Sequence, residues 1–358
     1  MKRIHLDFDK RAYDICIAQD FALLADEVKK LNASKILIIT DSNVSKLYLK
    51  EVYDILKGVC TSVASAQFAA GEMSKNLATI QRLYEACVQN GLDRKSVIVA
   101  LGGGVVGDMA GFVAASFMRG IRFVQIPTTL LAQTDSSVGG KVGVDFAGYK
   151  NIIGAFKQPA LVYINAQTLK SLPPREFAAG MGEVIKYGII RDAAFLDYLK
   201  ANVQRIRSFA TDEIETVLEK CCRIKADVVE QDETEGGLRA ILNFGHTVGH
   251  AIESAKDFSL LHGECVGLGM ICALSIAQER GWVSQADVEK VRELLAIYDI
   301  KTQVDGLSVD TVADFMMKDK KVENGVLKFV LAEPMGNAKI VTDVTKQELS
   351  DAIKAVLV

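Results

Sequence analysis

The placement of proline restricts the fold of this 358-residue chain more than any other feature. None of its five prolines lies between Pro174 and Pro334. Within that interval, apolar residues recur at helical spacing in three segments, 211–231, 245–255 and 263–280. The second half is therefore predicted to be mainly helical. The chain end is predicted to form a small hairpin around Asn324-Gly325, followed by a closing helix.

The first half has a different rhythm, in which short apolar runs alternate with helix-like segments such as 21–31. This alternation predicts a largely parallel sheet covered by helices, and the apolar runs lack the two-residue period of a half-exposed strand. Pro173-Pro174 marks the expected joint. We expect an α/β domain over 1–173 and a mainly α-helical domain over 174–358. The strand-like runs lie at 3–8, 35–40, 96–102 and 122–127.

Composition excludes several classes of partner. The net charge of -3 and the pI near 5.9 provide no electrostatic footprint for nucleic acid, and no basic run indicates a membrane surface. The seven cysteines are odd in number, never spaced as CxxC and mostly set in apolar runs, which is typical of buried thiols in a reducing compartment. The N-terminus lacks a continuous apolar stretch. We expect a cytoplasmic protein that acts on a small molecule.

A glycine-rich segment, GGGVVGDMAGF, follows the apolar run that ends at residue 102. Gly102, Gly104 and Gly107 satisfy GxGxxG between a predicted strand and a predicted helix. Glycines there let the backbone approach a pyrophosphate at the helix N-terminus. A tight turn without a ligand is the alternative, and the motif lies downstream of the first strand, where the usual fingerprint is found. We infer dinucleotide binding in a variant arrangement.

Other polar residues are expected at strand ends or in loops. Asp41 and Asn43 follow a predicted strand, where ligands bind in open α/β sheets, and Asp41 is either a ribose partner or a helix cap. The segment TTLLAQTDSSVGGKVGVDF packs Asp135, Lys141 and Asp145 among glycines and small polar residues, which favours ligand contact over a functionless loop.

Three of the four histidines fall in one window. On a helix opened by Gly245, His246 and His250 would stand at i and i+4 on the same face, and His262 could add a third nitrogen for a divalent metal. Each histidine alone would more often be a core or capping residue, but the three together favour a metal site.

A carboxylate is needed to complete such a site. Glu183 and Lys186 stand at i and i+3 among apolar residues, and burying ionised groups is costly without partners or a metal. Glu183 is therefore the candidate carboxylate ligand.

These motifs together closely resemble the 3-dehydroquinate synthase family. The resemblance covers nearly the whole chain and rests on GGGVVGDMAGF, PTTLLAQTDSSVGGKVGVDF, KNIIGAF, GEVIKYG, LNFGHTVGHAIE, HGE and the late DKK. It implies a Rossmann-like NAD-binding domain, a helical metal- and substrate-binding domain, and an assembly that is commonly a homodimer.

The resemblance also assigns roles residue by residue. It makes Glu183, His246 and His262 the ligands of Zn²⁺ or Co²⁺, which changes the spacing argument, because His250 then belongs to the substrate and proton-transfer site. The residues implied around substrate are Arg119, Asp135, Lys141, Lys150, Asn151, Lys186, Lys225, Arg239, Asn243, His250 and Lys320, with Lys321 as the rival of Lys320. The residues implied around NAD are Asp41, Asn43, Glu72, Lys75, Gly103, Gly104, Asp108, Thr128 and Thr129, with Lys141 and Lys150 shared between NAD and substrate.

The implied reaction converts 3-deoxy-D-arabino-heptulosonate 7-phosphate to 3-dehydroquinate and phosphate, in the shikimate pathway of aromatic amino acid and chorismate biosynthesis. This is a carbon–oxygen lyase reaction with transient oxidation by NAD, phosphate elimination, reduction and aldol closure. A glycerol-dehydrogenase-like enzyme, a related sugar phosphate cyclase and a non-catalytic dinucleotide-binding protein are the alternatives. The basic residues argue against a small uncharged polyol as substrate, and Lys225 with Arg239 favours a carboxylate-bearing one.

Overall fold

The structure is a computed structural model that describes residues 1–8, 11–317, 322–323 and 326–358. The chain divides into two compact units. The first consists of Met1–Leu172 and Ile214–Glu230, and the second of Pro173–Glu213 and Gln231–Val358. One division falls at Pro173, where a joint was expected. Ile214–Glu230, which the sequence placed in the second domain, groups with the first unit.

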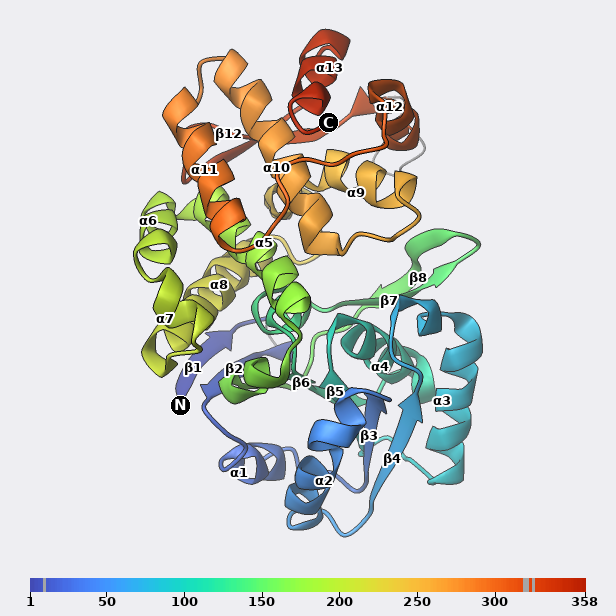
Figure 1. Cartoon of the computed structure of the whole chain (residues 1–358). Helices are drawn as coiled ribbons and strands as arrows, with labels where there is room; N and C mark the ends of the chain where they lie inside the picture. Colours follow the sequence, from blue (N-terminus) through green and yellow to red (C-terminus); the bar gives the residue numbers. More distant parts are fainter. Residues whose placement is uncertain (9–10, 318–321, 324–325) are drawn as a thin grey trace. The chain divides into compact units, whose positions relative to one another are not determined.

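The first unit is built on a sheet, with seven strands in the described part of the chain, in the order β1-β2-β9-β6-β5-β3-β4. β1 pairs with β2 antiparallel and the remaining neighbours run parallel, which confirms the predicted, largely parallel sheet. Figure 1 shows these strands side by side. Their bounds are Lys2–Leu6 (β1), Tyr13–Ala18 (β2), Ile36–Asp41 (β3), Val63–Phe68 (β4), Val97–Gly102 (β5), Arg122–Pro127 (β6) and Leu161–Asn165 (β9).

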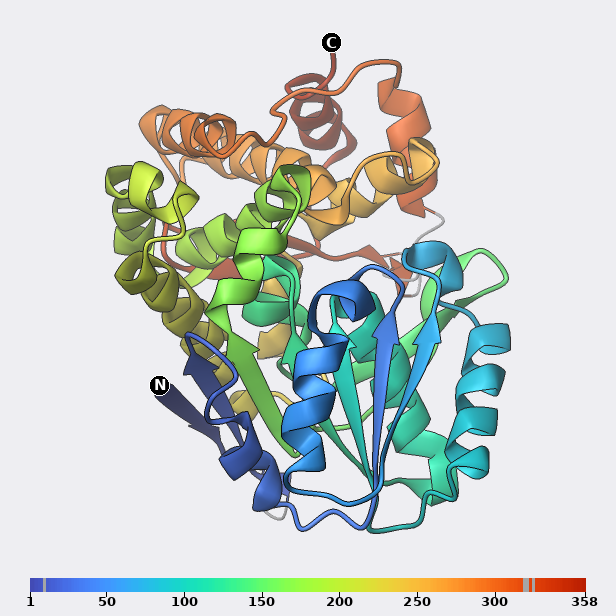
Figure 2. The ribbon, with the colours of Figure 1, turned by 60° about the horizontal axis from the view of Figure 1, so that its bottom comes forward.

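Both faces of this sheet are buried under helices (Figure 2). Ile36 and Ile38 of β3 pack in a core with α1 and α2, whereas Leu37 and Ile39 pack in a second core with α3 and α4. Complete burial of each such side chain contributes about 1.5–3 kcal/mol, so both faces of one strand add to stability. This explains why the apolar runs lack alternation. The helices are Leu24–Lys29 (α1), Lys50–Lys57 (α2), Leu77–Gln89 (α3) and Gly104–Ser116 (α4).

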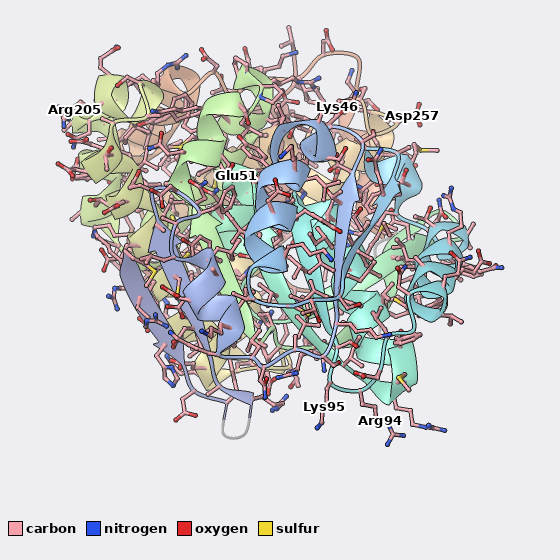
Figure 3. All side chains as sticks on the ribbon, turned by 90° about the horizontal axis from the view of Figure 1, so that it is seen from below. Lys46, Glu51, Arg94, Lys95, Arg205 and Asp257 are labelled. Carbon is pink, nitrogen blue, oxygen red and sulfur yellow. The ribbon has the colours of Figure 1, made fainter. Side chains whose placement is uncertain are left out.

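The remaining elements complete the first unit. β7 and β8 form an antiparallel hairpin, and Val142 and Val144 of β7 share a core with α4. The elements are Ser45–Leu49 (η2), Glu72–Ser74 (η3), Phe117–Arg119 (η4), Ala132–Ser136 (η5), Lys141–Phe146 (β7), Tyr149–Phe156 (β8), Ala166–Ser171 (η6) and most of Thr211–Gln231 (α8). At the edge of this unit, Arg94 and Lys95 point outward in the loop before β5 (Figure 3).

The second unit is mainly helical, as predicted. Its α10 is buried along most of its length and contacts α5, α9, α11 and α13 (Figure 1). The helices are Pro174–Arg191 (α5), Ala193–Ala201 (α6), Val203–Arg207 (α7), Leu238–Asn243 (η7), His246–Ala255 (α9), His262–Glu279 (α10), Gln285–Ile297 (α11), Val309–Met317 (α12) and Lys346–Lys354 (α13). The last of these is the predicted closing helix.

Two small antiparallel pairs accompany these helices. β10 (Val322–Glu323) pairs with β11 (Val326–Leu327), so the predicted hairpin is present, although its turn residues Asn324-Gly325 lie outside the described residues. β12 (Phe329–Ala332) pairs with β13 (Ala338–Val341). Among the described residues, no helix combines the length and apolar character needed to cross a bilayer.

Candidate active site

The glycine-rich turn has the predicted strand–turn–helix geometry. β5 ends at Gly102, Gly103 is extended, and α4 begins at Gly104. A Cβ on Gly102 would lie 2.5 Å from a methyl carbon of Val106, and one on Gly104 would lie 3.1 Å from the Ser136 hydroxyl oxygen. Larger residues would therefore push the turn apart. The turn leads directly into the N-terminus of α4, and backbone amides at a helix N-terminus bind anions such as a pyrophosphate.

Thr128 and Thr129 lie beside this turn because β6 is the neighbour of β5. The Thr128 amide donates to the carbonyl of Gly102 over 3.0 Å. A Cβ on Gly103 would lie 3.0 Å from the methyl carbon of Thr129. Four of the expected NAD residues are thus gathered where two parallel strands end.

Asp41 is the last residue of β3, the other neighbour of β5, and has a local role. Its Oδ1 accepts from the amides of Asn43, over 2.8 Å, and Val44, over 3.0 Å. These bonds hold the turn between β3 and η2, whose own N-cap is Val44, without a side-chain cap hydrogen bond. Asp41 is therefore a turn residue and not the cap of η2, and the ribose interpretation stays a prediction.

Lys75 and Asp108 form a buried ion pair that joins η3 to α4. Lys75 Nζ lies 2.6 Å from Asp108 Oδ2 and 3.9 Å from Glu72 Oε1, and its side chain is 5% exposed. Burial alone would lower the pKa of Lys75, but the carboxylates of Asp108 and Glu72 outweigh it and raise that pKa. The ammonium therefore stays charged near the start of α4.

Lys150 joins the same group from β8, with its Nζ 3.8 Å from Glu72 Oε1. The backbone of the next residue, Asn151, is left-handed with φ 51°, and its amide donates to Asp145 Oδ1 over 2.8 Å. Lys141 starts β7 and is exposed. The hairpin thus brings Lys150, predicted to contact both NAD and substrate, to Glu72 of η3.

Lys225 and Asp135 form a second pair within the first unit. Lys225 Nζ lies 2.8 Å from Asp135 Oδ1 and 2.8 Å from its carbonyl oxygen. Lys225 belongs to the part of α8 that groups with this unit, so the fold joins two residues 90 positions apart. Arg119 follows α4 as an exposed residue with φ 68°.

In the second unit, α5 carries Glu183 and Lys186 one turn apart, both almost inaccessible to solvent. Lys186 Nζ contacts Glu183 Oε2 and lies 5.1 Å from the centre of the Tyr187 ring. The predicted one-face geometry is confirmed. Since each charge has a partner, the cost of burying both is offset in part.

Three imidazoles converge beside Glu183. Its Oε1 lies 3.4 Å from His246 Nε2 and 3.3 Å from His262 Nε2. The ring of His250 centres 5.2 Å from that of His246 and 5.6 Å from that of His262, and one nitrogen from each ring can be chosen within 4.8 Å of the others. Helical spacing thus predicted the cluster correctly. His250 also lies near enough for a ring nitrogen to bind the same metal ion.

Close helix contacts bring these side chains together. A Cβ on Gly263, next to His262, would lie 1.8 Å from the carbonyl oxygen of Ala179 in α5. A Cβ on Gly269 of α10 would lie 1.8 Å from the carbonyl oxygen of Gly245, which precedes His246 with φ 77°. Only glycine permits these backbone approaches. α10 is therefore pressed against both helices that supply the other donors.

In two of the clustered rings, His246 and His262, the second nitrogen has an acceptor nearby. His246 Nδ1 lies 3.0 Å from the carbonyl oxygen of Phe244, and His262 Nδ1 lies 3.7 Å from Glu253 Oε2. Burial alone would lower the pKa of His262, but Glu183 and Glu253 outweigh it and raise that pKa to about 9. Glu253 had no assigned role in the sequence, although it follows His246 by seven residues and so shares its helix face.

The remaining predicted substrate residues of this unit lie around η7. Arg239 is buried and its guanidinium donates to the carbonyl of Glu233, whereas Asn243 Nδ2 donates to Glu235 Oε1 over 2.9 Å. Lys320 and its rival Lys321 lie outside the described residues.

The donor set in the second unit fits a divalent cation. Zinc bonds of about 2.0–2.2 Å in a tetrahedral site separate neighbouring donors by about 3.3–3.6 Å. The separations from Glu183 Oε1 to His246 Nε2 and His262 Nε2 are 3.4 and 3.3 Å. One carboxylate with two imidazoles is a common donor set for catalytic zinc.

Sequence comparisons cover most of the chain. Residues 65–179 match the sequence model of the 3-dehydroquinate synthase N-terminal domain, and residues 180–322 match that of the 3-dehydroquinate synthase C-terminal domain. The 3-dehydroquinate synthase of Ruminiclostridium cellulolyticum (strain H10) is 48% identical over 337 residues, which cover 94% of each chain.

Two solved structures of related enzymes share the fold. A 2-deoxy-scyllo-inosose synthase complexed with carbaglucose-6-phosphate, NAD⁺ and Co²⁺ aligns with a TM-score of 0.90 at 25% identity, covering 99% of this chain and 100% of that one. The 2-epi-5-epi-valiolone synthase of Streptomyces hygroscopicus subsp. jinggangensis 5008, with NAD⁺ and Zn²⁺ bound, aligns with a TM-score of 0.89 at 26% identity, covering 98% of both chains. Family match, sequence identity and fold agree, and the chain belongs to the 3-dehydroquinate synthase family.

Proposed function

We propose that this protein is a 3-dehydroquinate synthase, a phosphate-eliminating carbon–oxygen lyase that converts 3-deoxy-D-arabino-heptulosonate 7-phosphate to 3-dehydroquinate and phosphate. The observation that carries the proposal is the meeting of His246 Nε2 and His262 Nε2 at one oxygen of Glu183, in a chain of this family.

The proposed metal ligands are Glu183, His246 and His262. When bound there, Zn²⁺ or Co²⁺ would act as a Lewis acid that lowers the pKa of a substrate hydroxyl and polarises a carbonyl. His250 lies next to these ligands but is assigned to proton transfer, because a neutral imidazole accepts and returns protons near neutral pH. Lys186 offsets the charge of Glu183 from within the same helix.

The proposed NAD site uses the strand ends of the first unit. The turn at Gly103 and Gly104 would face the pyrophosphate, with Thr128 and Thr129 beside it. Asp41, Asn43, Glu72, Lys75 and Asp108 complete the set. When bound there, NAD would supply reversible hydride chemistry with no net oxidation over a turnover.

The substrate carries both a phosphate and a carboxylate, and the proposed contacts suit these anions. Lys141, Lys150, Lys225, Arg119 and Arg239 supply positive charge, whereas Asn151, Asn243 and Asp135 supply neutral or acidic hydrogen-bond partners. Asp135 also holds the ammonium of Lys225 through two oxygens. Lys320 is proposed for the same set from the sequence motif.

A related sugar phosphate cyclase is the second candidate, because both solved structures described above are such enzymes. Lys225 and Arg239 favour the synthase, since a carboxylate-bearing substrate needs basic partners that an uncharged sugar end does not.

The test combines metal-loaded protein, a catalytic amount of NAD and the heptulosonate phosphate, with phosphate and NADH followed together. The synthase releases phosphate in proportion to substrate consumed without accumulating NADH. Accumulation of NADH would indicate a dehydrogenase. In a parallel assay with glucose 6-phosphate, the sugar phosphate that the carbaglucose-6-phosphate of the inosose synthase structure resembles, phosphate release would indicate that type of cyclase.

We propose a homodimer in the cytoplasm as the working state. All seven cysteines, which lie within the described residues, are buried free thiols, as a reducing compartment allows. Sedimentation velocity would measure the assembly.

A further inference from the structure

Glu253 is a buried carboxylate on the metal-binding face of α9. It follows His250 by three residues and His246 by seven, so the three side chains share one side of the helix. Its side chain is 5% exposed. A carboxylate at such a position is costly unless positive charge or hydrogen-bond donors compensate it.

One partner of this carboxylate is the imidazole of His262. Glu253 Oε2 lies 3.7 Å from His262 Nδ1, which is within ion-pair range and slightly longer than a hydrogen bond. The opposite nitrogen, Nε2, lies 3.3 Å from Glu183 Oε1. The ring of His262 therefore stands between two carboxylates, one at each nitrogen.

His246 provides an internal comparison. Its Nε2 also faces Glu183 Oε1, and its Nδ1 lies 3.0 Å from the carbonyl oxygen of Phe244. Metal-binding histidines usually donate their second ring N–H to a carboxylate or a backbone carbonyl, which orients the ring and increases its basicity. In this cluster, His246 faces a backbone carbonyl and His262 faces a carboxylate.

We infer that Glu253 is the positioning residue of His262, and this inference rests on the proposed metal site. The carboxylate of Glu253 attracts the Nδ1–H of His262 and so keeps the proton on Nδ1, which directs the lone pair of Nε2 toward the metal. The contact joins α9 to the first residue of α10, which also gives the ring a fixed position relative to His246. Glu253 acts only through His262 and contacts neither metal nor substrate in this role.

The test measures zinc affinity of the purified full-length protein by chelator competition, together with the visible absorption of its cobalt form. Glu253→Ala is expected to weaken zinc binding about 10- to 100-fold, as the loss of such outer partners does. Glu253→Gln should lose less, because its amide oxygen still accepts from Nδ1–H. Both should alter the cobalt bands, which report the geometry of the ligands.

Glu264→Gln is the matched control. Glu264 is similarly buried and lies in the same region, but its oxygens accept from Arg175 at 2.9 and 2.7 Å and from the amide of Leu261 at 2.7 Å, not from an imidazole. This variant should lower the melting temperature and leave the cobalt spectrum unchanged. If Glu264→Gln weakens zinc binding as much as Glu253→Ala, the loss follows from loosened helices and the inference is overturned.

Two further outcomes distinguish a failure of the inference about Glu253 from a failure of the proposed metal site. If the unaltered protein binds zinc and both Glu253 variants bind it equally well with unchanged cobalt bands, the inference about Glu253 fails and the metal site stands. If the unaltered protein binds no zinc or cobalt, the proposed metal site fails, and the inference fails with it.

Discussion

The two groups of functional residues are built by different means. At the strand ends of the first unit, charged side chains are held in pairs, such as Lys75 with Asp108 and Lys225 with Asp135. In the second unit, two imidazoles meet one carboxylate oxygen, and helices in backbone contact hold them there.

This difference predicts different sensitivities. A charge pair tolerates small backbone shifts because long side chains can follow, whereas a set of metal donors tolerates very little because bond lengths are fixed to a few tenths of an ångström. Substitutions that move α10 should therefore affect metal binding, and substitutions in the first unit should affect local stability and NAD affinity.

The largest effect is expected from His246→Ala. Loss of an outer partner alone costs about 10–100-fold in metal affinity, so removal of a direct ligand should exceed about 100-fold and abolish activity. His250→Ala should keep one zinc per chain while turnover falls about 10²–10⁴-fold through lost proton transfer. Metal analysis and kinetics of both variants test this. Equal zinc loss in the two would contradict the division of roles.

Gly263→Ala tests the contact between α5 and α10. Its Cβ would lie 1.8 Å from the Ala179 carbonyl oxygen, so the helices must separate, at a cost of about 3 kcal/mol or more in the free energy of unfolding. Zinc affinity should fall as well. Gly267→Ala in the same helix is the control, because its Cβ meets a side-chain methyl group of Ile300 at 2.8 Å and not the backbone of α5. Equal zinc affinity of the two variants would show that helix contact does not set the donor geometry.

Lys75→Met tests the charge pairs of the first unit. It leaves Asp108 without its ammonium partner, and we expect a loss of about 1–3 kcal/mol in the free energy of unfolding with weaker NAD binding and unchanged zinc content. Lys50→Met is matched to it, since the Lys50–Asp54 pair has the same 2.6 Å separation but is exposed. That control should leave the free energy of unfolding almost unchanged, because solvent screens an exposed pair. Denaturant unfolding distinguishes the two, and similar losses would refute the importance of burial.

The parts of both sites that depend on short-range spacing could be predicted from the sequence. His246 with His250 and Glu183 with Lys186 were placed on common helix faces by their separations, and the glycine turn was placed between a strand and a helix. The family resemblance supplied the remaining candidates, whose roles stay predictions.

Long-range contacts were not visible in the sequence. Lys75 pairs with Asp108, which lies 33 positions later in the sequence. Glu253 lies beside His262 because the turn between α9 and α10 brings the two helices together. Spacing gives no information on such pairs, because the tertiary fold sets them. For the same reason Ile214–Glu230 was placed with the helical half, since its helical pattern does not reveal which unit it packs against.

The smallest structural effect is expected from Asp41→Asn. Asparagine can hold the same turn, because its side-chain oxygen also accepts from backbone amides, so the free energy of unfolding should change by less than about 0.5 kcal/mol. If Asp41 also binds the ribose, loss of its charge should weaken NAD binding about tenfold, as expected for a hydrogen bond to a charged group. Isothermal titration with NAD measures this. Unchanged NAD affinity would leave Asp41 as a turn residue alone.

The convergence of ligands on one cation is tested most directly by anomalous diffraction at the zinc absorption edge, from crystals of the zinc-loaded protein. We expect one strong peak within bonding distance of Glu183 Oε1, His246 Nε2 and His262 Nε2, with His250 outside that distance. A peak bound by His250 in place of Glu183, or no peak at this cluster, would contradict the account.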